Sequence, residues 1–207
     1  DNLYRIIGVI DGKVKLIKYD YANSNLLGTN GDYYGSTTPI ASYYKGKLTS
    51  VNTYYWNYKA SNNSSNTWST SLLNKTNLNT NFINNIGATW ANKIETTTWK
   101  VGGNTEANIG GAVPSVAYKN EITTPAENTT YDAKIGLIYT SDYGFAASPS
   151  AWTTNLSSYN SSSVTSVNWM YMGMSEWTIS RFSNTSVNVF FVITAGYVGN
   201  YTASYYV

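Results

Sequence analysis

The segment Ser175–Arg181 reads SEWTISR, and it begins the stretch of the chain that decides the fold. Trp177 and Ile179 are two positions apart, so a β-strand places both side chains on the same face, toward a core. Glu176 and Arg181 lie too far apart along one strand to pair with each other. We therefore expect Trp177 to be a core residue and the segment to be a hinge of the fold. The alternative is a ligand site in which Arg181 binds an anion and Trp177 stacks on that ligand.

Other β-prone runs surround this segment. VNWMYM (167–172) precedes it, and VNVFFVIT (187–194) and YVGNYTASYYV (197–207) follow it, with Gly and Asn between the runs. Upstream, AKIGLIYTSDYGFA (133–146) is expected to form a strand that enters a turn. Short β-prone runs at this spacing are typical of antiparallel strands. The sequence thus predicts a C-terminal β meander over about residues 133–207.

The N-terminal segment YRIIGVIDGKVKLIKY (4–19) predicts a β-hairpin over residues 3–18. Two β-branched runs flank Asp11 and Gly12, the residue pair that a type I′ turn prefers because both central positions need positive φ. In an α+β domain, we expect these strands to pair near the C-terminal ones and so close a sheet.

Helical periodicity is confined to the middle of the chain, about residues 67–95. Ser69 or Thr70 is a plausible N-cap, and Gly87 can end the helix. A second short helix is expected over 88–95, with Trp90 and Ile94 on one face. The apolar residues that recur at three-to-four spacing are Leu72, Leu73, Leu78, Phe82, Ile83 and Ile86.

The remaining segments are expected to be loops or short extended pieces. Residues 20–66 and 104–131 are predicted to be loops, apart from a strand in TSVNTYYWNY (49–58), and TTTWKVGG (96–103) is predicted to be extended. The chain of 207 residues is expected to form a single domain, 1–207. Its fold class is α+β, mostly antiparallel β with one or two helices and long loops.

The composition excludes several classes of chemistry. The sequence has no Cys and no His, which excludes disulfides, thiol nucleophiles and imidazole bases. Charged residues make up 12% of the chain, and more than a third of the residues are Asn, Ser or Thr. We expect such a neutral, hydrogen-bonding surface on a secreted or cell-surface protein.

Nucleic acid and membrane are not expected as partners. The net charge is +2, and the Lys and Arg residues are scattered, with no basic stripe that could follow a phosphate backbone. No apolar run approaches the ~20 residues of a membrane-spanning helix. Because the chain begins at Asp1, we expect it to be a mature or excised segment.

The acidic residues do not form a catalytic pattern. Glu121 with Glu127, or Glu95 with Glu106, are the pairs that a glycosidase mechanism would have to use, and their spacing does not favour it. Asp142 is the best isolated carboxylate, but an Asp at a turn more often caps its own backbone. We predict no catalytic residue, no metal ligand and no cofactor.

Tyrosine is the remaining signal, with 20 in the chain. Tyr offers a large, rigid contact surface at low entropy cost, and Asn and Ser add adaptable hydrogen bonds, as in antibody paratopes. The alternative is that many of these rings fill a β core. The candidates in the first part of the chain are Tyr33, Tyr34, Tyr43, Tyr44, Tyr54, Tyr55 and Tyr58.

The order of these motifs resembles a family of surface proteins of Gram-positive gut bacteria, several of which carry a pilin-like N-terminal segment. Their C-terminal domain has the C-type-lectin-like fold that formylglycine-generating enzymes and the variable proteins of diversity-generating retroelements share. The motifs that carry the resemblance are LYRIIGVIDGKVKLIK (3–18), NTWSTSLLNKTNLNTNFI (66–83), WANKIETTTWKVGG (90–103), AKIGLIYTSDYGFA (133–146), NWMY (168–171), EWTISR (176–181) and NVFFVITAGYVGNYTASYYV (188–207).

The resemblance implies a C-type-lectin-like fold whose last hairpin carries the ligand-facing residues. Formylglycine-generating chemistry requires cysteines, and the Glu-Pro-Asn, Gln-Pro-Asp and Trp-Asn-Asp triplets of calcium-dependent lectins are absent, so neither activity is expected. With the two residues of the alternative above, the candidate ligand-binding residues are Trp177, Arg181, Phe182, Asn184, Asn188, Phe190, Tyr197, Asn200 and Tyr201.

The expected function is therefore non-enzymatic recognition at the cell surface or outside the cell, adhesin-like, with a host or bacterial surface protein or a glycan as partner. The alternative is a structural pilin or filament subunit that self-assembles through Tyr- and Asn-rich faces. An intramolecular Lys–Asn isopeptide bond, with Lys15 or Lys134 as the lysine, is a further possibility within the structural class.

Overall fold

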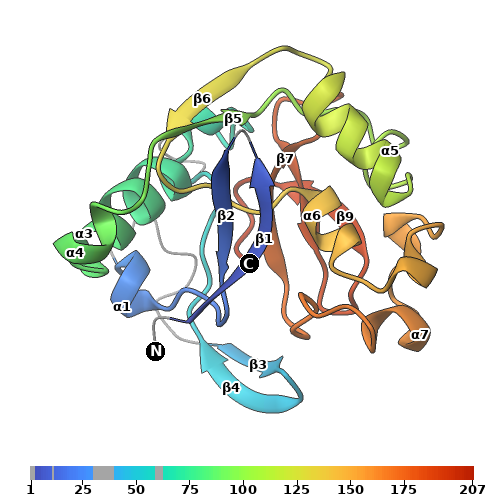
Figure 1. The fold of residues 1–207 in the computed structure, drawn as a ribbon, viewed down its shortest axis with the longest axis horizontal. Helices are drawn as coiled ribbons and strands as arrows, with labels where there is room; N and C mark the ends of the chain where they lie inside the picture. Colours follow the sequence, from blue (N-terminus) through green and yellow to red (C-terminus); the bar gives the residue numbers. More distant parts are fainter. Residues whose placement is uncertain (1–2, 11, 30–39, 59–62) are drawn as a thin grey trace.

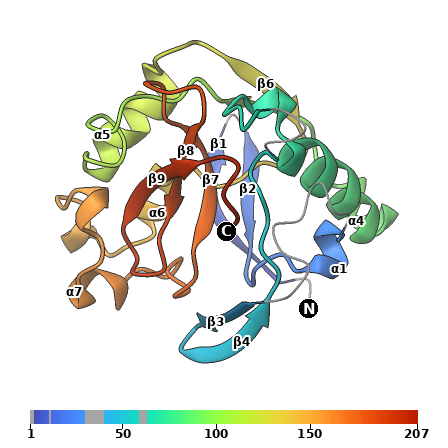
Figure 2. The same cartoon turned by 180° about the vertical axis from the view of Figure 1, so that it is seen from behind.

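The computed structural model describes residues 3–10, 12–29, 40–58 and 63–207 (Figures 1 and 2). A three-stranded antiparallel sheet lies at its centre, in the order β7 (Glu176–Arg181), β8 (Asn188–Val192) and β9 (Val198–Thr202). The predicted meander is thus confirmed for the last three strands. Residues 167–172, expected to be a fourth strand, contribute only an isolated bridge between Ala147 and Asn168.

The middle strand of this sheet is buried on both faces, because β8 sends alternate side chains into two different hydrophobic clusters. Val189 and Phe191 pack in the first cluster with Trp56 and other residues of the helical half of the chain. Phe190 and Val192 pack in the second cluster with residues of the α5–α7 region. A strand that is buried on both faces shows a continuous apolar run instead of alternation, which explains the sequence NVFFV.

The N-terminal hairpin forms as predicted, from β1 (Tyr4–Ile10) and β2 (Lys13–Lys18). Ile10 pairs with Lys13 across a two-residue turn in which Gly12 has φ +75°; Asp11 lies outside the described residues. The expected pairing with the C-terminal strands is wrong, because β1 and β2 form a two-stranded sheet of their own.

The hairpin instead contacts the rest of the protein through side chains. Ile7 and Ile17 pack against the second cluster. The hairpin lies in front of β7–β9 in Figure 1 and behind them in Figure 2. Two further hairpin-like sheets pair β3 (Ile40–Tyr44) with β4 (Lys47–Val51) and β5 (Thr97–Lys100) with β6 (Thr130–Ala133).

The predicted strand over 49–58 is only partly present. β4 covers its beginning, and Tyr55 then forms an isolated bridge with Tyr206. Tyr54 and Val207 exchange backbone hydrogen bonds of 2.7 and 3.0 Å. The last residues of the chain therefore lie beside residues 54–57 and, within the described residues, do not pair with the N-terminal strands.

The middle of the chain is helical, as predicted, but its main helix has wider turns than an α-helix. Residues 73–82 form a π-helix, which continues directly into α3. Gly87, with φ +84°, then breaks the helix, and α4 follows it. The side chains of Asn79 and Thr80 donate to the carbonyls of Asn74 and Lys75, five residues back, and so stabilise the wide turn. The elements of this part are α1 (Ser24–Leu27), η2 (Trp68–Thr70), η3 (Leu73–Phe82), α3 (Ile83–Asn85) and α4 (Ala88–Ala91).

The ends of this helical part differ from the prediction in two places. Ser71, rather than Ser69 or Thr70, accepts a backbone hydrogen bond from its third following residue. Trp90 is 44% exposed while Ile94 packs against the first cluster, so these two side chains do not share one buried face.

Short helices occupy segments that were expected to be loops or strands. Pro114 stands in the first turn of α5, where its missing N–H is no loss, and Asp142 caps α6 inside the predicted strand-and-turn segment 133–146. These elements are α5 (Pro114–Tyr118), η4 (Lys119–Thr123), α6 (Thr140–Phe145), η5 (Pro149–Ala151), η6 (Leu156–Ser158) and α7 (Ser162–Thr165).

The result is a mixed α+β structure with small antiparallel sheets and few helices. The helical part around α1, α3 and α4 lies on one side of the central sheet, and α5–α7 lie on the other (Figure 1). Within the described residues, no helix has both the length and the apolarity to cross a membrane.

Candidate functional site

Trp177 is a core residue, as the alternation predicted. Its side chain is 7% exposed, its indole Nε1 donates to the Tyr54 carbonyl at 2.9 Å, and its ring centroid lies 5.5 Å from that of Phe191. Arg181 makes a bidentate ion pair with Glu127, with Nη1–Oε2 at 3.0 Å and Nη2–Oε1 at 2.9 Å. The ring that was to stack on a ligand is buried, and the guanidinium already has a carboxylate partner, so this segment is a structural hinge.

The other residues proposed for the last hairpin do not gather on one surface. Phe190 is fully buried, and Phe182 packs on it with ring centroids 5.7 Å apart. Asn188 donates to Asn200, which in turn donates to Glu106 at 2.7 Å, so these amides are occupied within the protein. Tyr197 is partly buried, Asn184 is exposed, and Tyr201 is 48% exposed.

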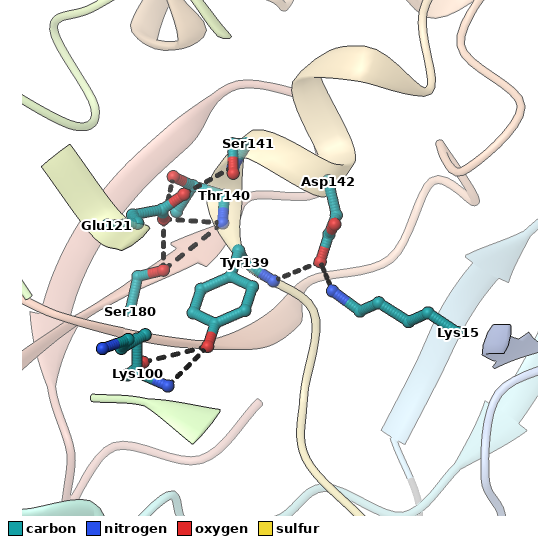
Figure 3. A network of polar contacts seen from close by, with 8 residues as sticks. All are labelled: Lys15, Lys100, Glu121, Tyr139, Thr140, Ser141, Asp142 and Ser180. Carbon is teal, nitrogen blue, oxygen red and sulfur yellow. Dashed lines mark hydrogen bonds and ion pairs between the residues drawn. The ribbon is translucent and has the colours of Figure 1, made fainter. Parts of the chain in front are cut away.

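A buried polar network connects η4, α6 and β7, and sequence reasoning did not find it (Figure 3). The carboxylate of Glu121 accepts hydrogen bonds from the backbone N–H groups of Thr140 and Ser141 and from the hydroxyls of Thr140 and Ser180. Burial raises the pKa of Glu121, and the hydrogen bonds from Ser141, Ser180 and Thr140 oppose that shift. None of the four residues is more than 3% exposed, so no substrate reaches the carboxylate.

Asp142 joins the N-terminal hairpin to α6 beside this network (Figure 3). Its Oδ2 accepts the backbone N–H of Tyr139 at 2.8 Å, which confirms the predicted capping role, and pairs with Lys15 Nζ at 2.6 Å. Lys15 also lies 4.8 Å from the ring centroid of Tyr139. The Lys–Asn isopeptide prediction is not supported: Lys15 faces an aspartate, and Lys134 donates to the Ala91 carbonyl.

In the carboxylate pairs considered for glycosidase chemistry, each carboxylate interacts with a different group of the protein and not with the other member of its pair. Glu121 lies in the buried network, and Glu127 pairs with Arg181. Glu95 pairs with Lys13, and Glu106 accepts from Asn200. The described part of the chain contains no group of three or more acidic residues that could hold a metal ion.

Five tyrosines form a continuous surface chain, which we call the tyrosine chain. Successive ring centroids lie 4.9, 6.1, 5.0 and 4.5 Å apart, and the third pair is stacked, with 9° between the ring planes. The three rings at one end are 48, 42 and 40% exposed. In order along the chain of contacts, the members are Tyr58, Tyr55, Tyr206, Tyr205 and Tyr201.

The tyrosine chain presents apolar rings with free polar tips. None of its five hydroxyls makes a hydrogen bond to another described residue. Burial raises the pKa of Tyr55, with smaller contributions from Tyr58 and Tyr206, so this phenol stays neutral and can donate. Neutral hydroxyls on exposed rings are suited to uncharged, hydroxyl-rich ligands.

The backbone places these rings together, which no local pattern indicates. Tyr55 and Tyr206 are opposite each other in an isolated antiparallel bridge, although 150 positions separate them in the sequence. Tyr55, Tyr58 and Tyr201 were among the candidates predicted from the sequence, whereas Tyr205 and Tyr206 were not. The only sequence signal for these two is the closing YYV motif.

The other tyrosine candidates have different surroundings. Tyr54 is buried in the first cluster, and its hydroxyl donates to the Gly28 carbonyl at 2.8 Å. The Tyr44 hydroxyl donates to Asp20. Tyr33, Tyr34 and the side chain of Tyr43 lie outside the described residues.

Comparisons with protein-family models, with curated proteins and with solved structures gave no match to this chain.

Proposed function

We propose that the protein is a non-enzymatic recognition domain that acts outside the cell or at its surface and binds a neutral glycan on the tyrosine chain. The observation that carries this proposal is the run of five contacting tyrosine rings whose hydroxyls have no hydrogen-bond partner among the described residues. The closed network around Glu121 argues against an enzyme, since the best-assembled polar group is out of reach of substrate. The composition, poor in charged residues and rich in Asn, Ser and Thr, supports the location.

The size of the tyrosine chain favours a glycan over a folded protein. A fully exposed Tyr offers about 200 Å², so the three rings that are 40–48% exposed present roughly 260 Å² together. A stable protein partner needs about 800 Å² on each side. A few sugar rings, with one apolar face each to stack on Tyr and hydroxyls to pair with its O–H, fit the smaller area.

For the scaffold we propose the C-type-lectin-like fold. The order of an N-terminal hairpin, a helical middle and C-terminal antiparallel strands supports it, as does the return of the last residues to the centre of the protein. The separate two-stranded sheet of the N-terminal hairpin is a departure from the closed sheet that we expected.

Replacing Tyr205 with Ala is expected to weaken glycan binding by about tenfold or more, because its ring contacts both Tyr201 and Tyr206 and so occupies the middle of the exposed end. A glycan array with the wild-type protein would first identify a binding sugar. Calorimetric titration of that sugar would then compare the variant with the wild type.

Tyr118→Ala is the matched control for this measurement. Tyr118 is 45% exposed, like Tyr205, but it lies on α5 and contacts no other aromatic ring among the described residues. It should leave the affinity unchanged. Equal losses in both variants, or no glycan bound by the wild-type protein, would contradict the proposal. If the wild-type protein bound a protein partner instead, and the Tyr205 variant did not, the tyrosine chain would still be the binding surface but its ligand would be a protein.

A second candidate function, a self-assembling structural subunit, is favoured by the outer face of the N-terminal hairpin. Ile6 is paired with Leu16 and Val9 with Val14, and these four side chains are 52–69% exposed. About 400 Å² of contiguous apolar surface is at the size that marks interaction sites. Two such hairpins placed face to face would cover each other, so the partner that we propose is a second copy of this chain.

Light scattering after size exclusion tests this second candidate. At 500 µM the wild-type protein should elute as a dimer or a larger species, and Val9→Lys should elute as a monomer, because a charge at the centre of the face cannot be buried unpaired. Leu48→Lys is the control: Leu48 is 66% exposed but belongs to β4. A wild-type monomer at this concentration would rule out assembly through the hairpin.

A further inference from the structure

Beside the N-terminal hairpin there is a second, chemically different site, a shallow pocket that encloses about 340 Å³ when the open solvent in front of it is included. Three separate segments form it: the hairpin, the turn between β3 and β4, and residues 169–172. Its lining residues are Arg5, Ile17, Lys18, Tyr19, Lys45, Trp169, Met170 and Met172. The tyrosine chain has no residue in this pocket, and the inference is independent of the proposed function.

Arg5 is held in an unusual position at this pocket. Its guanidinium carbon lies 4.8 Å from the ring centroid of Tyr19 and 5.1 Å from that of Trp169, so two aromatic rings fix the side chain. The guanidinium makes no hydrogen bond or ion pair with any described residue, although it carries five N–H donors. An ordered cation with free donors is ready to receive the two oxygens of an oxyanion.

Two lysines add to the positive charge at the pocket. Lys45 Nζ lies 3.7 Å from the ring centroid of Tyr19 and 3.2 Å from Asp20 Oδ1, so one carboxylate neutralises it. That carboxylate also accepts the Tyr44 hydroxyl. Lys18 has no ion pair among the described residues. The charge left over at the pocket therefore comes from Arg5 and Lys18.

Apolar side chains complete the pocket beneath these cations. Met170 and Met172 are 2% and 8% exposed, and Ile17 packs with the second cluster. The backbone N–H of Lys45 donates to the Met172 carbonyl at 2.8 Å, which fixes the β3–β4 turn against this floor. Thioether side chains adapt to irregular apolar groups.

From this arrangement we infer that the pocket binds a small organic anion, whose carboxylate, sulfate or phosphate group pairs with Arg5 and Lys18 while a compact apolar ring lies between Trp169 and the methionines. An inorganic anion would use the cations only and make no contact with the apolar side chains of the pocket.

The experiment follows the indole N–H resonance of Trp169 by NMR during titration with phenyl phosphate, benzoate, benzyl alcohol and inorganic phosphate. Saturable shifts are expected with the two organic anions, and inorganic phosphate and the neutral alcohol should each bind at least tenfold more weakly. The absence of a saturable shift with either organic anion at 10 mM would overturn the inference. Equal binding of inorganic phosphate would overturn the role of the apolar floor.

Two variants separate the pocket from general charge attraction. Arg5→Gln should weaken binding of phenyl phosphate at least tenfold, because it removes the charged fork but leaves an exposed polar side chain that the fold tolerates. Lys75→Gln removes the same charge from the exposed surface of η3 and should change the affinity less than twofold. Equal weakening in both variants would show nonspecific attraction and overturn the inference. Arg5→Lys, with the charge but without the fork, should give an intermediate loss.

Discussion

Glu121→Leu is expected to lower the free energy of unfolding by about 3–5 kcal/mol, because it removes the common acceptor of a buried cluster of donors and leaves those donors in place. The backbone N–H groups of Thr140 and Ser141 are fixed at the start of α6, and without Glu121 the N–H of Thr140 keeps only a long contact of 3.4 Å with the Ser180 hydroxyl. The hydroxyl of Ser180 loses its acceptor at the same time. Leu has about the volume of Glu, so the loss reports hydrogen bonds and not a cavity.

The control for this change is Glu127→Gln. Its carboxylate belongs to an exposed ion pair with Arg181, and such pairs contribute less than about 1 kcal/mol. Urea denaturation followed by Trp fluorescence measures both variants. Glu121→Leu with a loss below 1 kcal/mol would show that the donors find other partners and that the network is not the anchor of α6.

Glu176→Gln is expected to have the opposite effect, a stabilisation that grows with pH. Burial raises the pKa of Glu176 from its usual 4.5 to about 8, and its Oε1 is buried with no hydrogen-bond partner among the described residues. Between these two values the folded protein keeps the proton and the unfolded chain releases it. The contribution of Glu176 to the stability of the wild-type protein therefore falls as the pH rises from about 4.5 to about 8, and then levels off.

The Gln variant cannot ionise, so this dependence on pH is absent in it. Near pH 4.5 the two proteins should have similar stability, and near pH 8.5 the variant should be more stable by up to about 4 kcal/mol. Urea denaturation at pH 4.5, 6.5 and 8.5 gives the comparison, with Glu95→Gln as a control on an exposed carboxylate. A stability difference that does not change with pH would show that Glu176 is ionised in the folded protein.

The surroundings of Glu121 and Glu176 could not be predicted from the sequence, unlike the local elements of the fold. The sequence predicted the alternation that buries Trp177 and Ile179, since a period of two is visible in six residues. It also predicted the hairpin around Gly12, because the turn chemistry is local. The surroundings of Glu121 depend on donors 19 to 59 positions away, and no local pattern specifies them.

The missed helices have a similar cause. α5 and α6 are only five and six residues long, too short for their periodicity to stand out from a loop, although Pro114 and Asp142 are recognisable start signals. The π-helix resembles an α-helix in its apolar spacing, and only its hydrogen bonds distinguish them. For the surface sites, only the residue types are visible in the sequence, while the contacts of Tyr55 with Tyr206 and of Arg5 with Trp169 come from the tertiary structure.

The side-chain docking of the N-terminal hairpin has a thermodynamic consequence. Within the described residues, no backbone hydrogen bond joins β1 or β2 to any other element, so the hairpin can separate from the body without breaking a sheet. The pocket has one wall on each side of this junction, with Arg5 on the hairpin and Trp169 on the body. Any molecule held between them strengthens the attachment of the hairpin by the same factor by which attachment strengthens its own binding. Ligand binding and hairpin attachment are thus thermodynamically coupled equilibria.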